Sequence, residues 1–279
     1  MNRSVRARPD LLRALGRNEP PRRIEIASGL YRRVDVLKHD SWAATALYRG
    51  TNGDVICKFN RVQPIFGLPM SWLGRCLGRR EAHALQHLAD VPGIPAGCGP
   101  VFVNGRRWEN AVAHAYIPGH PLRAQERPSD EFFPALRTLL EAMHRQDMAY
   151  VDLHKRENIV VGNDGKPYLV DFQVCFSLWV SHRAKNPVLR SILRALQQGD
   201  MYHLAKHVHR NCPCEMGRLR LADHQRPPWW IRVHRLVAVP LRWLRRALLV
   251  ALGVRAEGGR AVTEAFPEDA IRHELRPAA

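Results

Sequence analysis

The sequence predicts an α+β protein, because it combines two β-hairpin patterns with one strongly amphipathic helix. The first hairpin covers 44–59 and turns at Asn52-Gly53, and the second covers 158–172 and turns at Asp164-Gly165. Both dipeptides tolerate the positive φ angles of tight hairpin turns, and β-branched neighbours favour extended backbone. The helix covers 130–147, where apolar residues recur with helical spacing.

The remaining elements follow from the same signals. Strands are predicted where short apolar runs meet turn residues, and helices where apolar residues recur at three and four positions. Ser129 or Asp130 is the expected N-cap of the helix at 130–147. The other expected elements are a short helix at 10–17, strands at 31–36, 100–104 and 110–117, and helices at 79–89, 177–195 (broken at Asn186-Pro187) and 200–208.

The charge is strongly positive: 43 Lys and Arg against 26 Asp and Glu give +17 over 279 residues. Such a surface attracts anions, which include nucleotides, nucleic acids and anionic membrane faces, although a generally basic protein is the alternative. The arginines are spread rather than interleaved with aromatic residues in one patch, so nucleic acid is a poor candidate partner.

The cysteines and the N-terminus suggest a cytoplasmic protein. The six cysteines are scattered, and two of them lie inside apolar runs, which is typical of reduced, buried thiols rather than of a disulfide framework. The basic N-terminal segment lacks the continuous apolar run of a secretory signal, and no long uncharged stretch predicts a transmembrane helix.

Three polar residues flank the second hairpin, and formation of the hairpin itself requires none of them. Asp152 precedes it, Asn158 stands at its entry and Asp171 at its exit. Two carboxylates and an amide at one end of a hairpin suit a hard divalent cation and a proton, because Mg²⁺ takes oxygen ligands and commonly bridges to substrate phosphates. The sequence therefore predicts a magnesium site here.

The segment 150–173, YVDLHKRENIVVGNDGKPYLVDFQ, resembles the catalytic and metal-binding loops of the protein-kinase-like family. The resemblance implies a bilobal fold with a small β-rich N-lobe and a larger helical C-lobe, and ATP and Mg²⁺ as ligands. In it, Asp152 accepts the proton of the acceptor hydroxyl, and Asn158 and Asp171 hold Mg²⁺. No Ala-Pro-Glu motif or long activation segment follows Asp171, so the chain is more similar to bacterial RIO, aminoglycoside and lipopolysaccharide-sugar kinases than to regulated protein kinases.

Upstream, Val55-Ile56-Cys57-Lys58 resembles the family's Val-Ala-Ile-Lys strand, whose lysine contacts the α- and β-phosphates. Strand alternation places Cys57 on one face and Lys58 on the other. A lysine inside an apolar strand needs an anionic partner, because an isolated buried ammonium is costly. Glu81, on the predicted helix at 79–89, lies where the family places the glutamate that pairs with this lysine; a solvated glutamate favoured by the helix dipole is the alternative.

Tyr116 and Ile117, before Pro118-Gly119, resemble the kinase hinge, whose backbone meets adenine; an ordinary linker is the alternative. The resemblance covers roughly residues 30–210 and implies the organisation of the chain. The expected parts are a basic N-terminal extension at 1–29, an N-lobe at 30–118, a C-lobe at 119–226, an amphipathic segment at 227–254 and a C-terminal tail at 255–279.

One family feature is missing, namely the glycine-rich loop. The stretch 38–45, KHDSWAAT, has no glycine, so its amides cannot approach phosphates as a Gly-x-Gly-x-x-Gly turn does. The hydroxyls of Ser41 and Thr45, or the amides beside Ala43 and Ala44, are the available substitutes.

Two segments near the C-terminus carry further hypotheses. Residues 227–254 place arginines on one helical arc and leucines and valines largely opposite, with tryptophans nearby, which is typical of a helix at an anionic membrane face; a helix packed on the domain is the alternative. Such a helix would put the protein at the inner face of the membrane. His203, His207, Cys212 and Cys214 form a metal-like cluster, but their spacing departs from structural zinc motifs.

Two functional hypotheses remain. The first is a phosphotransferase that uses ATP and Mg²⁺ and acts on a hydroxyl acceptor, with Lys58 on the phosphates and Asp152 on the hydroxyl. The second is a pseudokinase or nucleotide-sensing scaffold at the membrane surface. It is favoured by the missing glycines, by Gln173 in place of the glycine of Asp-Phe-Gly, and by a spacing from Asp152 to Asn158 that is one residue longer than usual.

Overall fold

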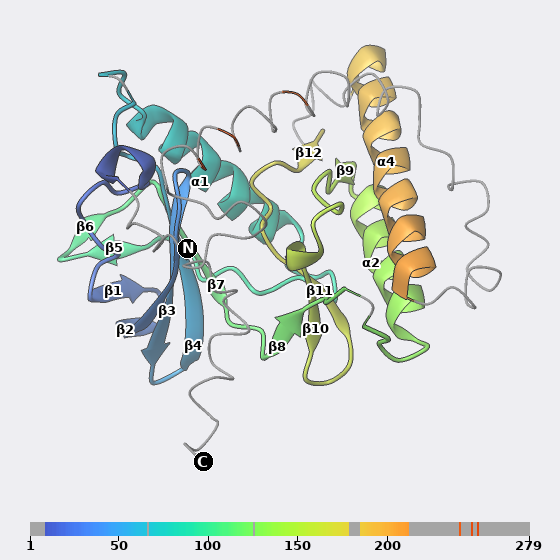
Figure 1. Ribbon diagram of the computed structural model, residues 1–279, viewed down its shortest axis with the longest axis horizontal. Coiled ribbons are helices and arrows are strands. Elements are labelled where there is room, and N and C mark those ends of the chain that lie inside the picture. The colour runs from blue at the N-terminus through green and yellow to red at the C-terminus, as the bar shows by residue number, and fades with distance from the viewer. Residues whose placement is uncertain are drawn as a thin grey trace. The chain divides into compact units, whose positions relative to one another are not determined.

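The computed structural model describes residues 9–65, 67–124, 126–178 and 185–211, together with Pro240, Ala247 and Val250. These residues form a mixed α/β structure with antiparallel sheets and three α-helices, consistent with the predicted α+β class (Figure 1). The described chain divides into two compact units: unit 1 holds 9–83 and 96–116, and unit 2 holds 84–95 and 117–211. Among the described residues, no helix is both long and apolar enough to span a bilayer.

Unit 1 is built on a curled antiparallel sheet of seven strands in the order β6-β5-β1-β2-β3-β4-β7. Strand β1 lies within the range that the sequence assigned to the N-terminal extension. The strands are β1 (Arg23–Ile26), β2 (Gly29–His39), β3 (Ala43–Gly50), β4 (Gly53–Asn60), β5 (Phe102–Val103), β6 (Arg106–Arg107) and β7 (Ala111–Ala115).

The hairpin predicted around Asn52-Gly53 is confirmed as β3 and β4, and Gly53 has the expected positive φ of 103°. The register separates two faces of the sheet. Cys57 lies opposite Ala46 and Ala113 in the larger apolar core of unit 1. Lys58 lies opposite Thr45 and Val112, on the other face. The alternation predicted from the sequence is therefore correct.

Helix α1 (Ser71–His87) begins eight residues before the predicted helix at 79–89. Gly74 and Gly78 lower helix propensity, which concealed the first two turns in the sequence. Both glycines are needed for packing: a Cβ on Gly74 would lie 2.1 Å from the carbonyl oxygen of Arg61, and one on Gly78 would lie 3.0 Å from that of Glu109. Close approach of backbone to backbone thus outweighs propensity here.

The helix predicted at 10–17 is wrong: only a 3₁₀ turn, η1 (Asp10–Leu12), forms there. The backbone of this segment makes only short-range turns within itself, such as the Gly16 amide to the Arg13 carbonyl at 3.2 Å, and it also bonds to other parts of unit 1. The Ala14 amide donates to the Asp40 carbonyl at 2.7 Å, and the Ala14 carbonyl accepts the amides of Val62 and Gln63, each at 3.0 Å. A short helix is marginal alone, so these tertiary bonds decide the conformation.

A fully buried arginine, Arg61, holds this part of unit 1 together. Its guanidinium donates to the carbonyls of Gln63 at 2.7 Å, Ser41 at 2.6 Å, Leu11 at 2.8 Å and Pro64 at 3.2 Å. Burial lowers the pKa of the guanidinium, and these four partners are all backbone carbonyls. Four carbonyls thus share one buried charge, and three chain segments are tied to the end of β4.

Unit 2 contains two small sheets and two helices that lie side by side, α2 and α4 (Figure 1). The hairpin predicted around Asp164-Gly165 is confirmed as β10 and β11. The elements are β8 (Gly119–Pro121), α2 (Phe132–Arg145), β9 (Met148–Ala149), η2 (Arg156–Asn158), β10 (Ile159–Gly162), β11 (Pro167–Leu169), β12 (Phe176–Ser177) and α4 (Pro187–Asn211).

Both helices of unit 2 differ from the prediction at their ends. The N-cap of α2 is Glu131 and makes no side-chain cap, so neither Ser129 nor Asp130 has the predicted role. The two helices predicted at 177–195 and 200–208 are wrong as separate elements, because α4 is continuous from Pro187. Its start at the predicted break is confirmed, since the Asn186 side chain accepts the amides of Val188 and Leu189, at 2.9 and 3.2 Å.

Candidate active site

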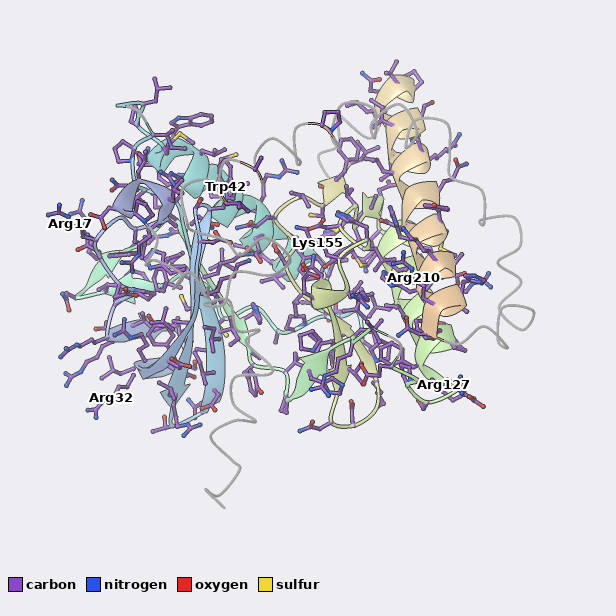
Figure 2. All side chains as sticks on the ribbon, viewed as in Figure 1. Arg17, Arg32, Trp42, Arg127, Lys155 and Arg210 are labelled. Atoms are coloured by element: carbon purple, nitrogen blue, oxygen red, sulfur yellow. The ribbon has the colours of Figure 1, made fainter. Side chains whose placement is uncertain are left out.

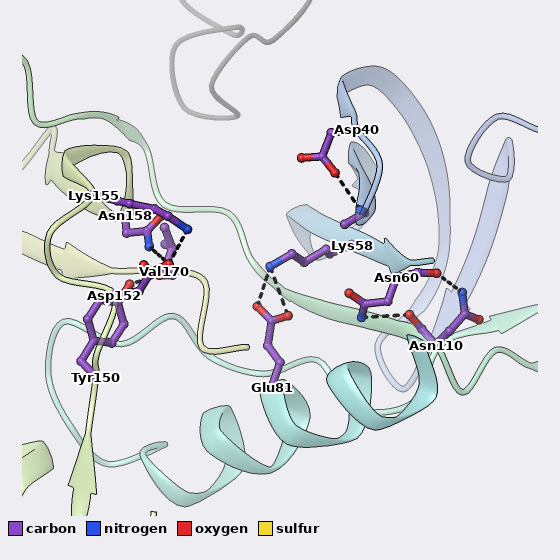
Figure 3. A network of polar contacts seen from close by, with 11 residues as sticks. Asp40, Lys58, Asn60, Glu81, Asn110, Tyr150, Asp152, Lys155, Asn158 and Val170 are labelled. Carbon is purple, nitrogen blue, oxygen red and sulfur yellow. Dashed lines mark hydrogen bonds and ion pairs between the residues drawn. The ribbon is translucent and has the colours of Figure 1, made fainter. Parts of the chain in front are cut away.

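In unit 1, the predicted pair of Lys58 and Glu81 is confirmed as an ion pair (Figure 3). Both carboxylate oxygens of Glu81 lie 3.3 Å from Lys58 Nζ, and the Glu81 side chain is 2% exposed. Strand β4 supplies the lysine and the middle of α1 supplies the glutamate. Because Glu81 is buried against the sheet, the alternative of a solvated glutamate is wrong. The pair places a lysine of fixed orientation on one sheet face.

An apolar cluster occupies that same side of β4. Ile56, two residues from Lys58 along the strand, packs with Leu37 and Leu47, and Tyr116 lies against them. Such a surface beside an ammonium group suits a ligand with an apolar ring and an anionic tail. The Tyr116 amide donates to the Asp54 carbonyl at 3.0 Å, so the sheet already uses it, whereas Ile117 begins the second segment of unit 2.

The loop between β2 and β3, where the sequence lacks glycines, is closed by its own carboxylate. Asp40 Oδ1 accepts the amides of Trp42 at 2.7 Å and Ala43 at 2.9 Å, and Lys38 Nζ lies 2.9 Å from Asp40 Oδ2. Burial alone would raise the pKa of Asp40, but Lys38 and the two amides outweigh it and lower the pKa. The loop amides expected to substitute for the glycines are therefore occupied.

The two hydroxyls suggested for the same task differ. Ser41 Oγ donates to the Leu12 carbonyl at 3.0 Å, so it is engaged in holding the loop to η1. Thr45 lies directly opposite Lys58 in the ladder and shares its face. Thr45 therefore remains a candidate phosphate contact.

In unit 2, Asp152 is the centre of a cluster of polar side chains and is 6% exposed (Figure 3). Its Oδ2 accepts hydrogen bonds from Lys155 Nζ at 2.6 Å and Asn158 Nδ2 at 3.1 Å. Its Oδ1 lies 3.3 Å from His154 Nδ1. All three partners belong to the short segment that follows Asp152, so the cluster is local. Two potential cations therefore stabilise one carboxylate.

The two ends of the hairpin, which carry the two predicted metal ligands, are joined by a backbone hydrogen bond. The Val170 amide donates to the Asn158 carbonyl at 3.1 Å, which places Asn158 beside the residue before Asp171. Because the amide nitrogen of Asn158 faces Asp152, its Oδ1 keeps both lone pairs for a cation. An amide oxygen and a carboxylate fit Mg²⁺, which commonly takes one or two such protein ligands and completes its shell with water and phosphate.

The backbone around Asp171 is strained and held on both sides. Asp171 has a φ of 65°, and the preceding Val170 carbonyl accepts the Tyr150 hydroxyl. The following Phe172 is buried and packs edge-on against Tyr150, with the ring centres 5.4 Å apart. A left-handed residue other than glycine is uncommon and persists only where its surroundings fix it. The structure therefore sets the direction of Asp171.

Helix α4 holds the loop that carries Asp152. Asp200 is fully buried in the middle of α4, and its two oxygens accept the amides of Tyr150 and Val151, each at 2.8 Å. His144 also lies 3.1 Å from Asp200 Oδ2. The N-cap role considered for Asp200 is therefore wrong, and the loop-orienting role is correct. Val151 has a φ of 71°, which a β-branched residue adopts only under such restraint.

Two turns further along α4, His207 makes a second bond to the same loop. Its Nε2 donates to the Leu153 carbonyl at 2.7 Å, while its Nδ1 is buried and has no hydrogen-bond partner among the described residues. Burial lowers the pKa of His207 to about 4, partly offset by the Leu153 bond. His207 is thus a neutral positioning residue for the segment of Asp152.

Sequence reasoning missed three of these groups as functional candidates. His154 and Lys155 lie inside the recognised segment, and their separation from Asp152 in a short loop was the available signal. Asp40 gave no such signal, and His207 was singled out only as a possible metal ligand, because the partners of both are backbone groups whose positions depend on the fold.

The zinc hypothesis lies partly outside the described residues, since it includes Cys212 and Cys214. Within the described part of the chain, no group of three or more His, Cys, Asp or Glu side chains is arranged to hold a metal ion. The His203 ring lies near the His154 ring, with ring centres 5.7 Å apart.

The amphipathic segment at 227–254 and the tail at 255–279 also lie outside the described residues, apart from Pro240, Ala247 and Val250.

Comparison with known proteins found no protein-family model and no curated sequence that matches this chain.

The Asp200→Asn variant should lower the free energy of unfolding by about 1–3 kcal/mol, because one of the two loop amides loses its charged acceptor. Urea denaturation measures this loss, and hydrogen exchange should quicken at Tyr150 and Val151. Asp90→Asn, a substitution at an exposed position, is the matched control. Equal stability of the two variants would contradict the restraining role of Asp200.

The stability of unit 2 should depend on pH through His207. Its pKa is near the ordinary value of about 6.5 when unfolded and about 4 when folded, so the stability it contributes is present above pH 6.5 and is lost as the pH falls toward 4. Between pH 7 and 5 the wild-type protein should lose about 2 kcal/mol more than His207→Gln, which cannot ionise. Urea midpoints measure the difference.

The control for this pH dependence is His209→Gln, which removes an exposed histidine of the same helix. It should keep the pH dependence of the wild-type protein. If His207→Gln keeps it too, the folded protein does not hold His207 neutral.

Proposed function

We propose that the chain is an ATP- and Mg²⁺-dependent phosphotransferase with a bilobal protein-kinase-like fold. Its acceptor is a hydroxyl group of a sugar, a lipid-linked sugar or a protein serine or threonine. The observation that carries the proposal is the arrangement around Asp152, where a nearly buried carboxylate is bonded to Asn158 at the end of the hairpin that leads to Asp171.

The groups of unit 2 have distinct chemical tasks in this proposal. Asp152 Oδ2 already accepts from Lys155 and Asn158, whereas Oδ1 has one neighbour among these side chains, His154 Nδ1 at 3.3 Å. The acceptor hydroxyl therefore donates to Oδ1, which then takes its proton. Asn158 Oδ1 and the Asp171 carboxylate hold Mg²⁺, which when bound neutralises phosphate charge. Lys155 carries a positive charge next to the general base and is a further candidate for phosphate contact.

The groups of unit 1 support nucleotide binding. Lys58 is oriented by Glu81 and can place its ammonium on the α- and β-phosphates. The apolar cluster of Leu37, Leu47 and Ile56 offers a surface for the adenine ring. Little covalent chemistry falls to the protein in phosphoryl transfer, so positioning and charge neutralisation by these groups provide most of the catalysis.

A comparison of Asp171→Asn with Asp152→Asn tests the proposal. Asp171→Asn should weaken Mg²⁺-dependent ATP binding about tenfold or more, because a metal ligand loses its charge. Asp152→Asn should leave ATP binding near that of the wild-type protein and lower ATP turnover about a hundredfold or more, because it removes only the base. Calorimetric binding and phosphate release measure the two effects.

The control for both variants is Asp164→Asn, which changes a carboxylate in the turn of the same hairpin. The phosphotransferase proposal fails if the wild-type protein shows neither Mg²⁺-dependent ATP binding nor turnover. ATP binding without turnover in the presence of sugar, lipid and protein acceptors would instead support a nucleotide-sensing scaffold.

The scaffold is a second candidate because of one observation, the occupied loop between β2 and β3. A glycine-rich loop offers free amides to phosphates, whereas here Asp40 accepts the amides of Trp42 and Ala43 and adds a negative charge. Phosphates approaching this loop would meet a carboxylate, whose charge Lys38 offsets in part, rather than free amide donors. Weak nucleotide binding is the expected consequence for either function.

Asp40→Asn should therefore raise the affinity for ATP about three- to tenfold. The amide oxygen still accepts the Trp42 and Ala43 amides, so the loop keeps its shape and only the charge is lost. Calorimetric titration measures the affinity, and Asp35→Asn, at an exposed position on β2, is the control. If both variants bind ATP as the wild-type protein does, the Asp40 carboxylate does not oppose the phosphates.

A further inference from the structure

Large apolar side chains are exposed around the buried Arg61 in unit 1. Leu68 is 67% exposed and Trp72, in the first turn of α1, is 60% exposed. The exposed side chains that we call the tryptophan surface are Leu11, Trp42, Val62, Leu68 and Trp72. They account for half of the exposed large hydrophobic residues among the described residues, whereas isolated ones elsewhere need no explanation.

Arg61 gathers these residues from four separate segments. Its side chain bonds to the Leu11 carbonyl, and its amide donates to the Trp42 carbonyl at 2.9 Å. Val62 follows it directly. Leu68 is tied back to Ile65 by two backbone bonds, of 2.9 and 3.1 Å. Gly74, one half-turn beyond Trp72, packs on the Arg61 carbonyl. The exposure is therefore built into the fold and is not confined to a loose loop.

Positive charge adjoins the tryptophan surface along α1. Residues 71–80 of this helix include Arg75, Arg79 and Arg80 and contain no acid. Glu109 partly offsets them, since it lies 3.0 Å from Arg79 and 3.9 Å from Arg75. The helix N-terminus adds further positive potential on the side of Trp72.

We propose that the tryptophan surface and Arg75, Arg79 and Arg80 form a peripheral docking site for a bilayer of anionic phospholipid. Tryptophan and leucine side chains enter the boundary between headgroups and acyl chains, and arginines attract the anionic headgroups. The aliphatic side chains argue against nucleic acid, which is bound by stacking aromatics and hydrogen-bond donors. Figure 2 shows Trp42 at one end of the sheet of unit 1 and Arg32 near the other, so the contact involves one end only.

This docking site does not rest on phosphotransfer, and it differs from the membrane hypothesis for residues 227–254. All its residues belong to unit 1, and no nucleotide or metal takes part. Vesicle binding measured without nucleotide therefore tests it separately from ATP binding, so that either proposal can fail while the other stands.

The experiment is sedimentation of the full chain with vesicles of phosphatidylcholine alone and of phosphatidylcholine mixed with phosphatidylglycerol. The wild-type protein should bind the anionic vesicles and should bind the neutral ones at least about tenfold more weakly, because each arginine near the surface contributes about 1 kcal/mol. Leu68→Ser/Trp72→Ser should lower the affinity for anionic vesicles about tenfold or more, because two apolar groups no longer enter the bilayer.

The matched control is Val188→Ser/Ile192→Ser, which removes two exposed hydrophobic residues from α4 in unit 2. This control should bind as the wild-type protein does. In a second pair, Arg75→Gln/Arg80→Gln should weaken binding about tenfold or more, whereas Arg23→Gln/Arg32→Gln, at exposed positions elsewhere on unit 1, should weaken it less. Circular dichroism confirms that each variant is folded.

Several results would overturn the proposal. These are no binding of the wild-type protein to anionic vesicles, equal binding of wild-type protein and Leu68→Ser/Trp72→Ser, or an equal loss in the Val188→Ser/Ile192→Ser control. Binding of Leu68→Ser/Trp72→Ser at wild-type strength would assign any membrane contact to another part of the chain.

Discussion

The candidate site of unit 2 depends on one buried carboxylate, that of Asp200. The loop that carries Asp152 lies outside any strand or helix at Tyr150 and Val151, so the amides of these two residues need acceptors from elsewhere in the fold. Asp200 supplies both missing acceptors from inside α4, and it does so for two consecutive amides. The strained φ of Val151 is the cost of this arrangement, and a fixed position for Asp152 is its consequence. Two turns later on α4, His207 makes a similar restraint by bonding to the Leu153 carbonyl in the next part of the loop.

In unit 1, irregular segments are also held by a buried charge, but the charge is a cation instead of an anion. Arg61 collects four carbonyls, as Asp200 collects two amides, and in both cases a buried charge is satisfied by the backbone of irregular segments. The loop between β2 and β3 shows the same principle on a smaller scale, since Asp40 closes it by bonding to its amides. Side-chain charges satisfied by backbone groups thus shape the loop that carries Asp152, the loop between β2 and β3, and the segments around Arg61.

The sequence predicted the parts of the fold that local chemistry controls. Both hairpins formed where Asn-Gly and Asp-Gly demanded a turn, and strand alternation correctly separated Cys57 from Lys58. Predictions failed where a tertiary contact opposed local propensity. Helix α1 runs through Gly74 and Gly78 because the backbone of neighbouring segments approaches there, and the segment at 10–17 is not helical because its backbone bonds to the loop at Asp40 and to the segment after Arg61.

For the candidate site, the sequence by itself determined the identity and order of Lys58, Glu81, Asp152, Asn158 and Asp171, since these residue types at that spacing carry the resemblance. Only the tertiary structure decided that Glu81 pairs with Lys58 and that Asp200 restrains a loop instead of capping a helix. It also decided that Asp40 occupies the amides that a phosphate would use. The physical reason is that a hydrogen bond to the backbone leaves no pattern in the side chains: the donor and acceptor are the same in every residue, and only the fold determines which of them a buried charge will meet.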